Sequence, residues 1–532
     1  MRVAQERGLI LLDRLNHSRS AKAVAFWTLY AIVTILAAAI YIRIVPSSDQ
    51  SIFDYLAWLN IHGVPYYEGS FDMTWPGQLV FHELAIRIFG VHPWTTRAGD
   101  FLFLQPAILA IYVFLRRAGL PGAAVCAALT YPIIYVTSGA WVSGHRDMTG
   151  MHFLIGAAIF ALPGRKRSPL AAIFSGLLIG YATMIRPTYL AFVPMLFVVA
   201  IPTWKGDGPW TKESLKQALL LGSGIAVAPL AFLLYGLATG TLYDWYVDSV
   251  RYIAEVYPSW TVDQSRWRLF TMAGNFIRLS LRWLVLAGAG GGLLWFFYGR
   301  NRQALGLLAG MVATVLISFF VQNKGFAAHL AGLIPVLLLL GWAGAAAAFV
   351  HPIGSRQLQN GLAALLAVLL IAGTGSRVIG AIPRAPDWGR QEQSNPLKLA
   401  DVIYFAGIMK SESSPSDTML QWSREYQEYQ VSFLSERRPP SKFFNVTGEQ
   451  LIKPGQPLFG QWLEQFQRDL DSQPPKFVLV DDSIIPPGTG LPAQGKANTA
   501  VDQIFKRRIN RGYDIHDRRG NWTLLERTGG GS

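Results

Sequence analysis

Charged residues are scarce in this sequence. Asp, Glu, Lys and Arg make up 15% of the 532 residues and hydrophobic residues 51%, whereas a soluble globular protein carries about 25% charge. The single cysteine, Cys126, lies in an apolar run, so the chain can form neither an intrachain disulfide nor a CxxC metal site. These shortages exclude a wholly soluble protein and a disulfide-stabilised one, and they favour a membrane protein.

Signatures of nucleotide and metal enzymes are missing as well. The C-terminal part contains no phosphate loop and no dinucleotide fingerprint, and no HExxH spacing of metal ligands occurs. We therefore predict that no cofactor and no metal is required. Carboxylates on the outer side of the membrane, together with His145, could nevertheless bind a divalent metal ion.

The net charge of +14 is unevenly distributed. From Gly380 to the end the chain has 19 basic and 18 acidic residues, so nearly all of the basic excess precedes Gly380. Such an excess in an apolar region is typical of the positive-inside rule for membrane proteins. With no such excess in the C-terminal part, the charge does not indicate nucleic-acid binding.

Eleven apolar stretches are candidates for transmembrane helices, each of which needs about 20 mostly apolar residues. The first follows a basic N-terminus and is too long for a signal-peptide core of about 7–15 residues, so we expect an uncleaved span. The eleven stretches are 23–45, 101–115, 119–138, 148–163, 169–186, 188–203, 215–237, 281–298, 303–321, 328–349 and 361–379. The predicted fold is a polytopic α-helical membrane protein of about eleven spans with a small C-terminal α/β soluble domain.

The loops predict the orientation of the chain. If the spans alternate, the basic loops share the N-terminal side, which the positive-inside rule makes cytoplasmic, and the acidic residues of the loops fall outside. We therefore expect a membrane domain over 1–379, with long outer loops at 46–99 and 239–280, and an outer α/β domain over 380–528. Residues 529–532, Gly-Gly-Gly-Ser, have the composition of a linker remnant.

Both the first outer loop and the C-terminal tail carry local patterns. In the loop, Ile52, Tyr55, Leu56 and Leu59 have helical spacing, which predicts an amphipathic helix on the membrane surface. We expect Asp54 and Asp72 of this loop to face water. In the tail, the patterns predict helices over 397–410 and 462–470, strands over 418–422 and 477–481, and a hairpin over 513–527 that turns near Arg519-Gly520.

Polar clusters lie at the outer ends of several predicted spans. Ionisable groups at membrane depth are costly and are therefore functional candidates. A carboxylate could take a proton from an acceptor hydroxyl, while cations could hold a phosphate and stabilise the charge that it gains on leaving. The clusters are Ser47-Ser48-Asp49-Gln50, His145-Arg146-Asp147, Gln322-Asn323-Lys324-Gly325-Phe326 with His329, and Arg186 before Pro187.

Each of these residues also has a purely structural interpretation. Asp49 could be the N-cap of the loop helix, and Asp147 could pair with Arg146 or cap the next span. Lys324, Arg146 and Arg186 could extend toward lipid headgroups. His329 could be a hydrogen-bonded interior histidine.

The first outer loop resembles that of the GT-C glycosyltransferases. The resemblance is carried by Ser48-Asp49-Gln50, Asp54-Tyr55-Leu56-Ala57, Gly63-Val64-Pro65-Tyr66-Tyr67 and Trp75-Pro76-Gly77. It is strongest to the bacterial branch related to protein O-mannosyltransferases, lipid A aminoarabinose transferases and rhizobial lipopolysaccharide galacturonosyltransferases. The family often has Asp-Glu where this chain has Asp49-Gln50, so only the first acid matches. His145-Arg146-Asp147 is similar to the second acidic position, and the cluster around Lys324 is similar to the basic motif near the donor phosphate.

The resemblance implies transfer of a monosaccharide from a polyprenyl-phosphate donor, with inversion at the anomeric carbon. The acceptor would be a glycolipid, a polysaccharide or a protein at the outer face of the bacterial inner membrane, which makes the α/β domain periplasmic. Asp49 would be the catalytic base, and Asp147 would orient the acceptor or a basic residue. The residues expected to bind substrate are His145, Arg146, Arg186, Lys324, His329 and Gln322, with Arg146, Arg186 and Lys324 on the phosphate.

Two other functions remain open at this point. An O-antigen ligase or polymerase would also use basic outer loops, but on a diphosphate-linked glycan. The other is a transporter or a non-catalytic membrane scaffold, and transporters usually place polar groups near the middle of the membrane, often in repeated halves. This sequence has its polar clusters at one face and no visible repeat, which favours the glycosyltransferase.

Overall fold

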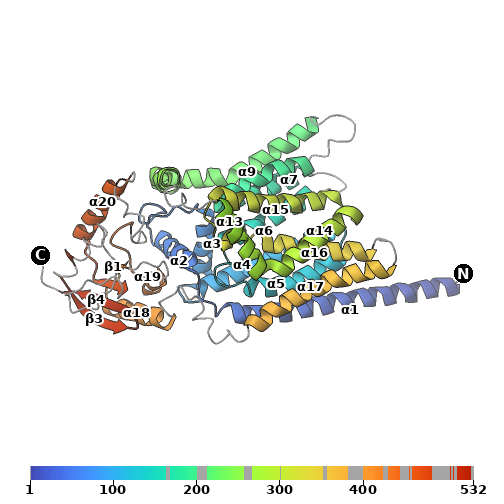
Figure 1. Cartoon of the computed structure of the whole chain (residues 1–532), viewed down its shortest axis with the longest axis horizontal. Coiled ribbons are helices and arrows are strands. Elements are labelled where there is room, and N and C mark those ends of the chain that lie inside the picture. Colours follow the sequence, from blue (N-terminus) through green and yellow to red (C-terminus); the bar gives the residue numbers. More distant parts are fainter. Residues whose placement is uncertain are drawn as a thin grey trace.

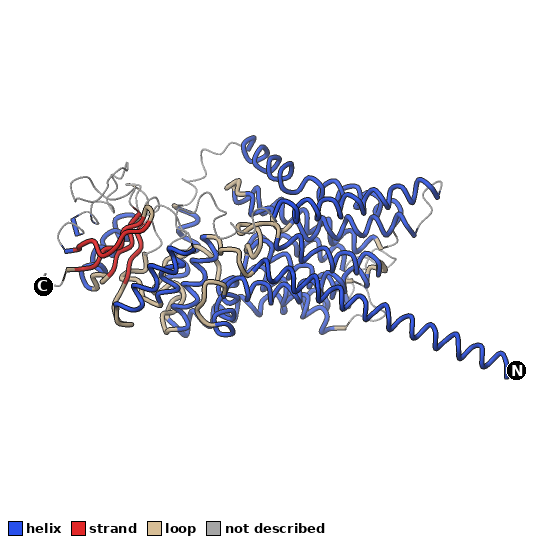
Figure 2. Tube along the Cα trace, turned by 90° about the horizontal axis from the view of Figure 1, so that it is seen from below, coloured by secondary structure: helices blue, strands red, loops and turns tan. Residues whose placement is uncertain are grey.

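The chain forms an elongated bundle of helices with a small sheet at one end (Figure 1, Figure 2). A computed structural model describes residues 2–162, 168–200, 212–256, 266–299, 301–350, 356–381, 399–422, 429–443, 455, 458–481, 504, 507–508 and 512–528. The N-terminus and the sheet lie at opposite ends of the bundle (Figure 1), as an odd number of spans would place them. Which end faces the periplasm stays a prediction, and the linker remnant at 529–532 lies outside the described residues.

A helix lies at each of the eleven predicted spans. These helices are α1 (Arg2–Tyr41), α4 (Thr95–Arg117), α5 (Pro121–Val136), α6 (Arg146–Ala161), α7 (Pro169–Ile185), the 3₁₀ segment η1 (Pro187–Ala191) continued by α8 (Phe192–Ala200), α9 (Lys212–Thr239), α14 (Arg282–Tyr298), α15 (Arg302–Gln322), α16 (Leu333–Val350) and α17 (Arg356–Ala381). The 3₁₀ segment η4 (Ala327–Leu330) precedes α16.

Six of the described helices are long and apolar enough to cross a membrane by length and composition. They are α1, α4, α9, α15, α16 with η4, and α17. The helix α7, with 17 residues, rises about 25 Å, which is less than the roughly 30 Å of a bilayer core. A polytopic helical membrane protein therefore fits the structure, while the count of eleven spans stays a prediction.

The helix α16 lies at the centre of the bundle. In the apolar stretch that it forms with η4, 94% of the residues are buried. It packs closely on α14 because two glycines meet: a Cβ atom on Gly344 would lie 2.1 Å from the Cα atom of Gly291. Small residues allow two helix backbones to approach in this way where the lipid provides no hydrophobic driving force. Membrane-facing helices such as α9 surround this centre and are far less buried.

The segment predicted to be the first outer loop, called the first outer segment below, contains α2 (Ser48–Ile61) and α3 (Gly77–Phe89). Our prediction that its first helix lies on the membrane surface was wrong, because α2 is buried on all sides from Ser51 to Leu59. One face packs on α3 and another on α19 (Tyr429–Ser435) of the C-terminal part. The Ser51 hydroxyl donates to Gln430 Oε1 at 2.9 Å, and the Tyr55 hydroxyl donates to the Arg437 carbonyl at 2.6 Å.

The C-terminal part holds a four-stranded sheet in the order β1 (Met419–Trp422), β2 (Phe477–Asp481), β4 (Trp522–Arg527), β3 (Tyr513–Arg519). The strands β1 and β2 are parallel, and β4 is antiparallel to both of its neighbours. The helices α18 (Leu399–Glu412) and α20 (Phe459–Ser472) accompany the sheet. The predicted strands and hairpin are thus confirmed, and the hairpin turns at Gly520 in a left-handed conformation with φ 63°.

The C-terminal part shares a hydrophobic core with the outer segments. Side chains of α2, such as Leu56 and Trp58, belong to the same buried cluster as Leu420, Phe433 and Val478. Val247 and Tyr252 of the second outer segment belong to it too. A separate C-terminal domain stays a prediction, and the shared core argues that this part folds against the outer segments.

Lys442 joins these three parts. The second outer segment comprises α10 (Leu242–Trp245), the π-helical η2 (Tyr246–Arg251), α11 (Tyr252–Glu255), α13 (Arg266–Phe276) and η3 (Ile277–Leu281). Lys442 Nζ lies 3.3 Å from Asp244 Oδ1 and 3.6 Å from Asp248 Oδ2, and its carbonyl accepts from the Phe71 N–H at 2.7 Å. Asp248 is fully buried, and burial raises the pKa of its carboxyl to about 8.

We predict that Asp248→Asn raises the melting temperature by an amount that grows with pH. A carboxyl with a raised pKa in the folded state is protonated in both states at low pH, and stability falls as pH rises from about 4 to about 8. Each pKa unit is worth about 1.4 kcal/mol, and the pKa of about 8 already includes the attraction of Lys442, so we expect a gain of a few kcal/mol at pH 8.

Melting temperatures of the purified protein at pH 5 and pH 8 test this prediction. Glu255→Gln removes an exposed carboxylate from the neighbouring α11 and should leave the melting temperature unchanged at both values. A gain in Asp248→Asn that is equal at both pH values would contradict the raised pKa.

Candidate functional site

The first turn of α2 presents Asp49. Gln50 Oε1 accepts from the Ser47 N–H at 2.9 Å, and Ser47 is the N-cap, so the interpretation of Asp49 as the cap was wrong. The Gln50 amide also donates to the Ser143 carbonyl at 3.1 Å, which ties α2 to the loop before α6. The Asp49 side chain is 34% exposed, and no hydrogen bond to its carboxylate is found among the described residues.

The N-terminus of α6 carries the second cluster. Gly144 has φ +73°, and a Cβ atom there would lie 2.4 Å from Gln50 Nε2, so only glycine lets the chain enter α6 beneath α2. His145 is the N-cap, with Nδ1 accepting from the Asp147 N–H at 3.3 Å. The first turn of α6 then presents Arg146 and Asp147, with Asp147 fully buried.

Asp147 is bound by Arg186. The residue before a proline favours an extended backbone, so Pro187 ends α7 and leaves Arg186 extended with φ −145° and ψ 101°. Arg186 Nε donates to Asp147 Oδ1 at 3.0 Å, and Nη2 lies 2.9 Å from Oδ2. The interpretations of Asp147 as a partner of Arg146 or as a cap were therefore wrong. A buried carboxylate needs such a partner.

The third cluster follows α15. Asn323 has a left-handed conformation with φ 49°, and Gly325 has φ 70°, so the chain turns sharply around Lys324. Burial and the charges of Arg146 and Arg186 hold the pKa of Lys324 well below its usual range, while Asp49 and Asp147 oppose this shift. Lys324 therefore lies within electrostatic reach of the other two clusters.

Gln322 and His329 flank Lys324. The Gln322 amide donates to the Ser318 carbonyl at 3.0 Å, and its Oε1 is buried with no hydrogen-bond partner. His329 is 2% exposed, its ring centre lies 6.0 Å from that of His145, and its Nδ1 is also without a partner. The interpretation of His329 as a hydrogen-bonded interior histidine thus lacks support at Nδ1.

Asp49 faces two basic side chains across a short gap. Its Oδ2 lies 3.9 Å from His145 Nε2 and 4.0 Å from Arg146 Nη2. Arg146 Nη1 donates to Thr74 Oγ1 at 3.0 Å, while Arg146 Nε is buried without a hydrogen-bond partner. A partly exposed carboxylate thus stands beside two basic side chains, and one of them, Arg146, has a buried donor available to a ligand.

The first outer segment supplies residues that the sequence analysis missed. Asp72 is buried, contrary to our expectation, and its Oδ1 accepts from the Thr74 N–H at 2.7 Å. Burial raises the pKa of Asp72 to about 6, with a contribution from Asp49. The Asp-x-Thr pattern of such a turn was visible in the sequence, but the hydrogen bond from Arg146 to Thr74 in this turn was not. Asp54 is also buried, so that expectation was wrong too.

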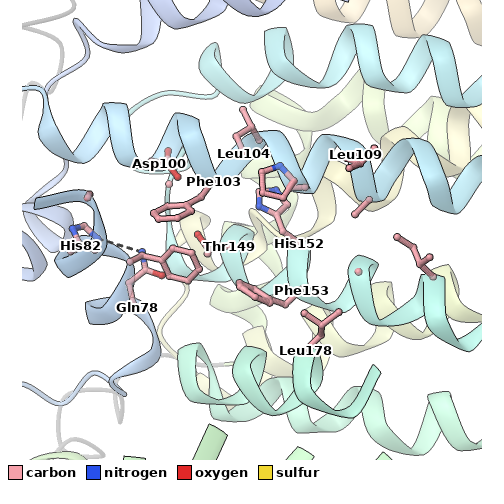
Figure 3. Close-up of a pocket in the computed structure, with 18 of the residues that line it drawn as sticks. Gln78, His82, Asp100, Phe103, Leu104, Leu109, Thr149, His152, Phe153 and Leu178 are labelled. Atoms are coloured by element: carbon pink, nitrogen blue, oxygen red, sulfur yellow. Dashed lines mark hydrogen bonds between the residues drawn. The ribbon is translucent and has the colours of Figure 1, made fainter. Parts of the chain in front are cut away.

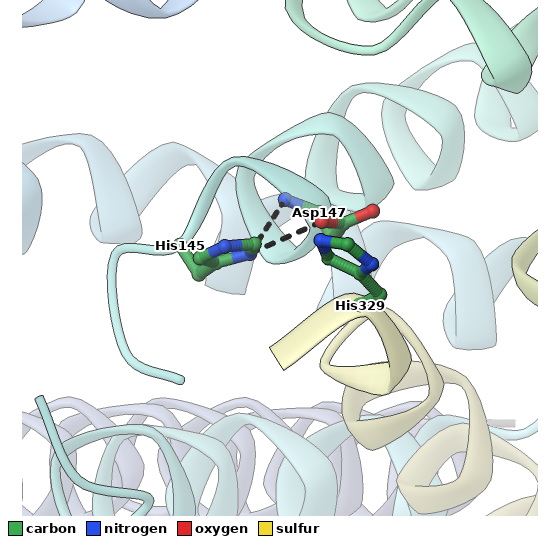
Figure 4. Close-up of side chains that lie close together, drawn as sticks. All are labelled: His145, Asp147 and His329. Carbon is green, nitrogen blue, oxygen red and sulfur yellow. Dashed lines mark hydrogen bonds and ion pairs between the residues drawn. The ribbon is translucent and has the colours of Figure 1, made fainter. Parts of the chain in front are cut away.

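His145, Asp147 and His329 form a possible metal-binding group. One ligand atom from each lies within 4.8 Å of the others (Figure 4). However, Arg186 contacts both Asp147 oxygens, and His145 Nδ1 lies 3.1 Å from Asp147 Oδ2. A divalent cation would have to displace Arg186 and be placed near Arg146 and Lys324, which is electrostatically unfavourable. The site is better suited to an anion.

Comparisons with known proteins bear on this arrangement. The family model for dolichyl-phosphate-mannose-protein mannosyltransferase matches residues 76–235, which include α6 and Arg186. Among proteins with curated annotation, no sequence matches significantly.

Solved structures extend the comparison to nearly the whole chain. ArnT from Cupriavidus metallidurans bound to undecaprenyl phosphate is 13% identical, with a TM-score of 0.59 over 95% of this chain and 98% of that one. Its apo form is 12% identical, with a TM-score of 0.57 over 96% and 98%. Archaeal oligosaccharyltransferase AglB from Archaeoglobus fulgidus is 14% identical, with a TM-score of 0.47 over 86% and 69%.

The central region is therefore similar in sequence to a family of membrane glycosyltransferases, and nearly the whole chain shares the fold of ArnT. The candidate site uses residues inside the matched region, such as Arg146 and Arg186, and residues outside it, such as Asp49 and Lys324.

We predict that Arg186→Met destabilises the protein by about 3–5 kcal/mol, because it leaves the buried Asp147 charge without its cationic partner. The double variant Asp147→Asn, Arg186→Met removes both charges and should recover most of the loss. Arg146→Met is the matched control: its partner Asp49 is 34% exposed, so the loss should be much smaller. Melting temperatures measured in one detergent compare the variants, and equal losses in Arg186→Met and Arg146→Met would contradict this account.

Proposed function

We propose that the enzyme transfers a monosaccharide from a polyprenyl-phosphate donor to a hydroxyl acceptor at the outer face of the membrane. The observation that carries this proposal is the placement of Asp49 within 4.0 Å of Arg146, in a site where Arg146 and Lys324 are half-buried and Arg186 is buried. The fold neighbour ArnT is solved with undecaprenyl phosphate, which supports a donor of this chemical class.

The cations suit the phosphate of the donor. Burial is the largest cause of the lowered pKa of Lys324, and the charges of Arg146 and Arg186 lower it further. A phosphate beside these side chains would favour the protonated amine of Lys324 and accept from the buried Nε of Arg146. As the sugar departs, the same groups would stabilise the charge that the phosphate gains.

Asp49 suits the role of general base. Its carboxylate is partly exposed and is not engaged in a short hydrogen bond with any described residue. It would take the proton of the acceptor hydroxyl while the hydroxyl oxygen attacks the anomeric carbon. The bond from that carbon to the phosphate oxygen breaks, polyprenyl phosphate leaves, and the configuration at the carbon is inverted.

Asp147 acts as a positioning residue in this scheme. Its Oδ1 accepts from Arg186, its Oδ2 lies 2.9 Å from Arg186 Nη2, and its side chain is fully buried, which favours a role toward Arg186 over one toward an acceptor. It therefore orients Arg186. His145 lies between Asp147 at 3.1 Å and Asp49 at 3.9 Å and would hold the base in place, while His329 and Gln322 offer unpartnered buried atoms to the substrate.

The proposal also includes the surroundings of the enzyme. It would lie in the bacterial inner membrane as a multi-pass protein, with residues 380–528 on the periplasmic side. The shared core between α2 and α19 would allow the C-terminal part to keep the Asp49 turn in place. No metal would be needed, since the cations already supply the positive charge.

We predict that Asp49→Asn lowers the rate of sugar transfer by about 10²–10⁴-fold, the usual contribution of a general base. The purified enzyme in nanodiscs, supplied with a panel of polyprenyl-phosphate hexoses and pentoses and membrane lipid extract, is assayed for release of polyprenyl phosphate. Glu68→Gln, an exposed carboxylate of the same outer segment, is the matched control and should retain full activity. A folded Asp49→Asn variant with full activity would remove Asp49 from the mechanism.

We further predict that Lys324→Met weakens donor binding by about tenfold or more, as expected for loss of one charge-assisted phosphate contact. Binding of a fluorescent polyprenyl phosphate measures the effect, with Arg302→Met, on a basic residue at the far end of α15, as the control. Binding to wild type should weaken as pH rises, because the anion favours the protonated amine. Unchanged affinity in Lys324→Met would contradict a role for this residue at the phosphate.

A further inference from the structure

A second, largely apolar cavity lies on the other face of α6. It has a volume of about 500 Å³ and is lined by α3, α4, α6 and α7 (Figure 3). Phe103, Phe153 and Leu178 form its apolar walls, and Gln50, next to Asp49 in the sequence, lines its polar end. The donor scheme makes no use of this cavity.

The cavity is long enough for a lipid chain. Thr96 and Arg117 of α4 both line it, and the 21 helical steps between these two residues extend over about 31 Å. This is close to the roughly 30 Å of a bilayer hydrocarbon core. Leu109 and Phe160, which also line it, are exposed on the side of the bundle, so a chain could enter from the bilayer.

The polar end presents hydrogen-bond acceptors. His82 Nδ1 lies 2.7 Å from Asp54 Oδ1, and both side chains are buried. With that nitrogen donating to Asp54, His82 Nε2 accepts from the Gln78 amide at 3.4 Å (Figure 3). Gln78 is 4% exposed, and its Oε1 is buried with no hydrogen-bond partner. A buried acceptor without a donor is costly, and a hydroxyl of a bound molecule would satisfy it.

Charge separates this cavity from the donor site. Among its lining residues, the only Lys or Arg is Arg117, at the far end of α4, where Nη1 donates to the Ile159 carbonyl. The acid Asp100 lies at the polar end (Figure 3). A phosphate would therefore be repelled here and attracted to Arg146 and Lys324. The two faces of α6 thus suit a phosphate on one side and an uncharged, hydroxyl-bearing head on the other.

We propose that the acceptor is a lipid with an uncharged, hydroxylated head, such as a glycolipid, and that its hydrocarbon chain occupies this cavity. Its head would lie at Gln78 and Gln50, from which a hydroxyl could reach Asp49. The identification of this lipid as the acceptor rests on the proposed function. The binding of the lipid in the cavity does not rest on the proposed function. The binding of the lipid and its role as acceptor are therefore tested separately.

Photolabelling tests the cavity without any donor. The full-length enzyme in nanodiscs is irradiated with monoglucosyl diacylglycerol that carries a diazirine in one acyl chain, and labelled peptides are identified by mass spectrometry. We expect labelling of α4 and α6. The Ala110→Trp substitution fills the cavity and should lower this labelling at least about fivefold. The control Leu102→Trp, at an exposed position of α4, should leave the labelling unchanged.

A second variant keeps the test decisive if Ala110→Trp does not fold. Gln78→Leu removes the unpartnered acceptor at similar volume and should lower labelling by the glucosyl lipid about two- to tenfold. Labelling by phosphatidic acid with the same diazirine chain should be weak in wild type and unaffected by Gln78→Leu. Equal labelling by the two lipids, or no change in any cavity variant, would overturn the proposal.

Two further outcomes separate the cavity from the proposed function. If a diazirine polyprenyl phosphate labels α4 and α6 in competition with the glucosyl lipid, the cavity holds the donor chain and the assignment to an acceptor is wrong. If the glucosyl lipid labels the cavity as expected but no polyprenyl-phosphate sugar is consumed, the cavity proposal stands and the proposed function fails. In an active enzyme, Ala110→Trp should raise the KM for the lipid acceptor and leave binding of the donor unchanged.

Discussion

The buried carboxylate of Asp147 is the constraint on which the site depends. A charge at this depth is tolerated only with a partner, and Arg186 supplies it with two contacts of 2.9 and 3.0 Å. This pairing requires α7 to end where Pro187 ends it, and it requires α6 to begin beside that break. The N-terminal turn of α6 is thereby fixed, and with it the positions of His145 and Arg146 relative to Asp49.

The sequence predicted the parts of the site better than their contacts. Costly ionisable groups at the ends of apolar stretches identified Asp49, Asp147 and Lys324, and the structure brings these clusters together. The sequence alone could not predict that Asp147 pairs with Arg186 and not with the adjacent Arg146. Residues i and i+1 point away from each other on a helix, while Arg186 arrives from a helix 39 residues further along the chain.

The error over α2 has a physical cause that was visible in the sequence. The spacing of Ile52, Tyr55, Leu56 and Leu59 describes one apolar stripe, but Phe53, Ala57 and Trp58 make the opposite faces apolar as well. A helix that is apolar on all sides is buried. What covers it is the C-terminal part, and neither the periodicity of α2 nor that of the tail could indicate that the two share a core.

Gln50 shows why one departure from the family pattern belongs to the architecture of this chain. Its oxygen accepts from the Ser47 N–H and its amide donates to the Ser143 carbonyl, so both ends of the side chain are used. A glutamate could make the first contact but would face the carbonyl of Ser143 with a second acceptor. The amide therefore holds α2 against the loop that leads into α6, and Gln50 also lines the apolar cavity. Because an amide stands where the family often has a second acid, Asp49 is the only carboxylate in this first turn of α2, and it lies 4.0 Å from Arg146.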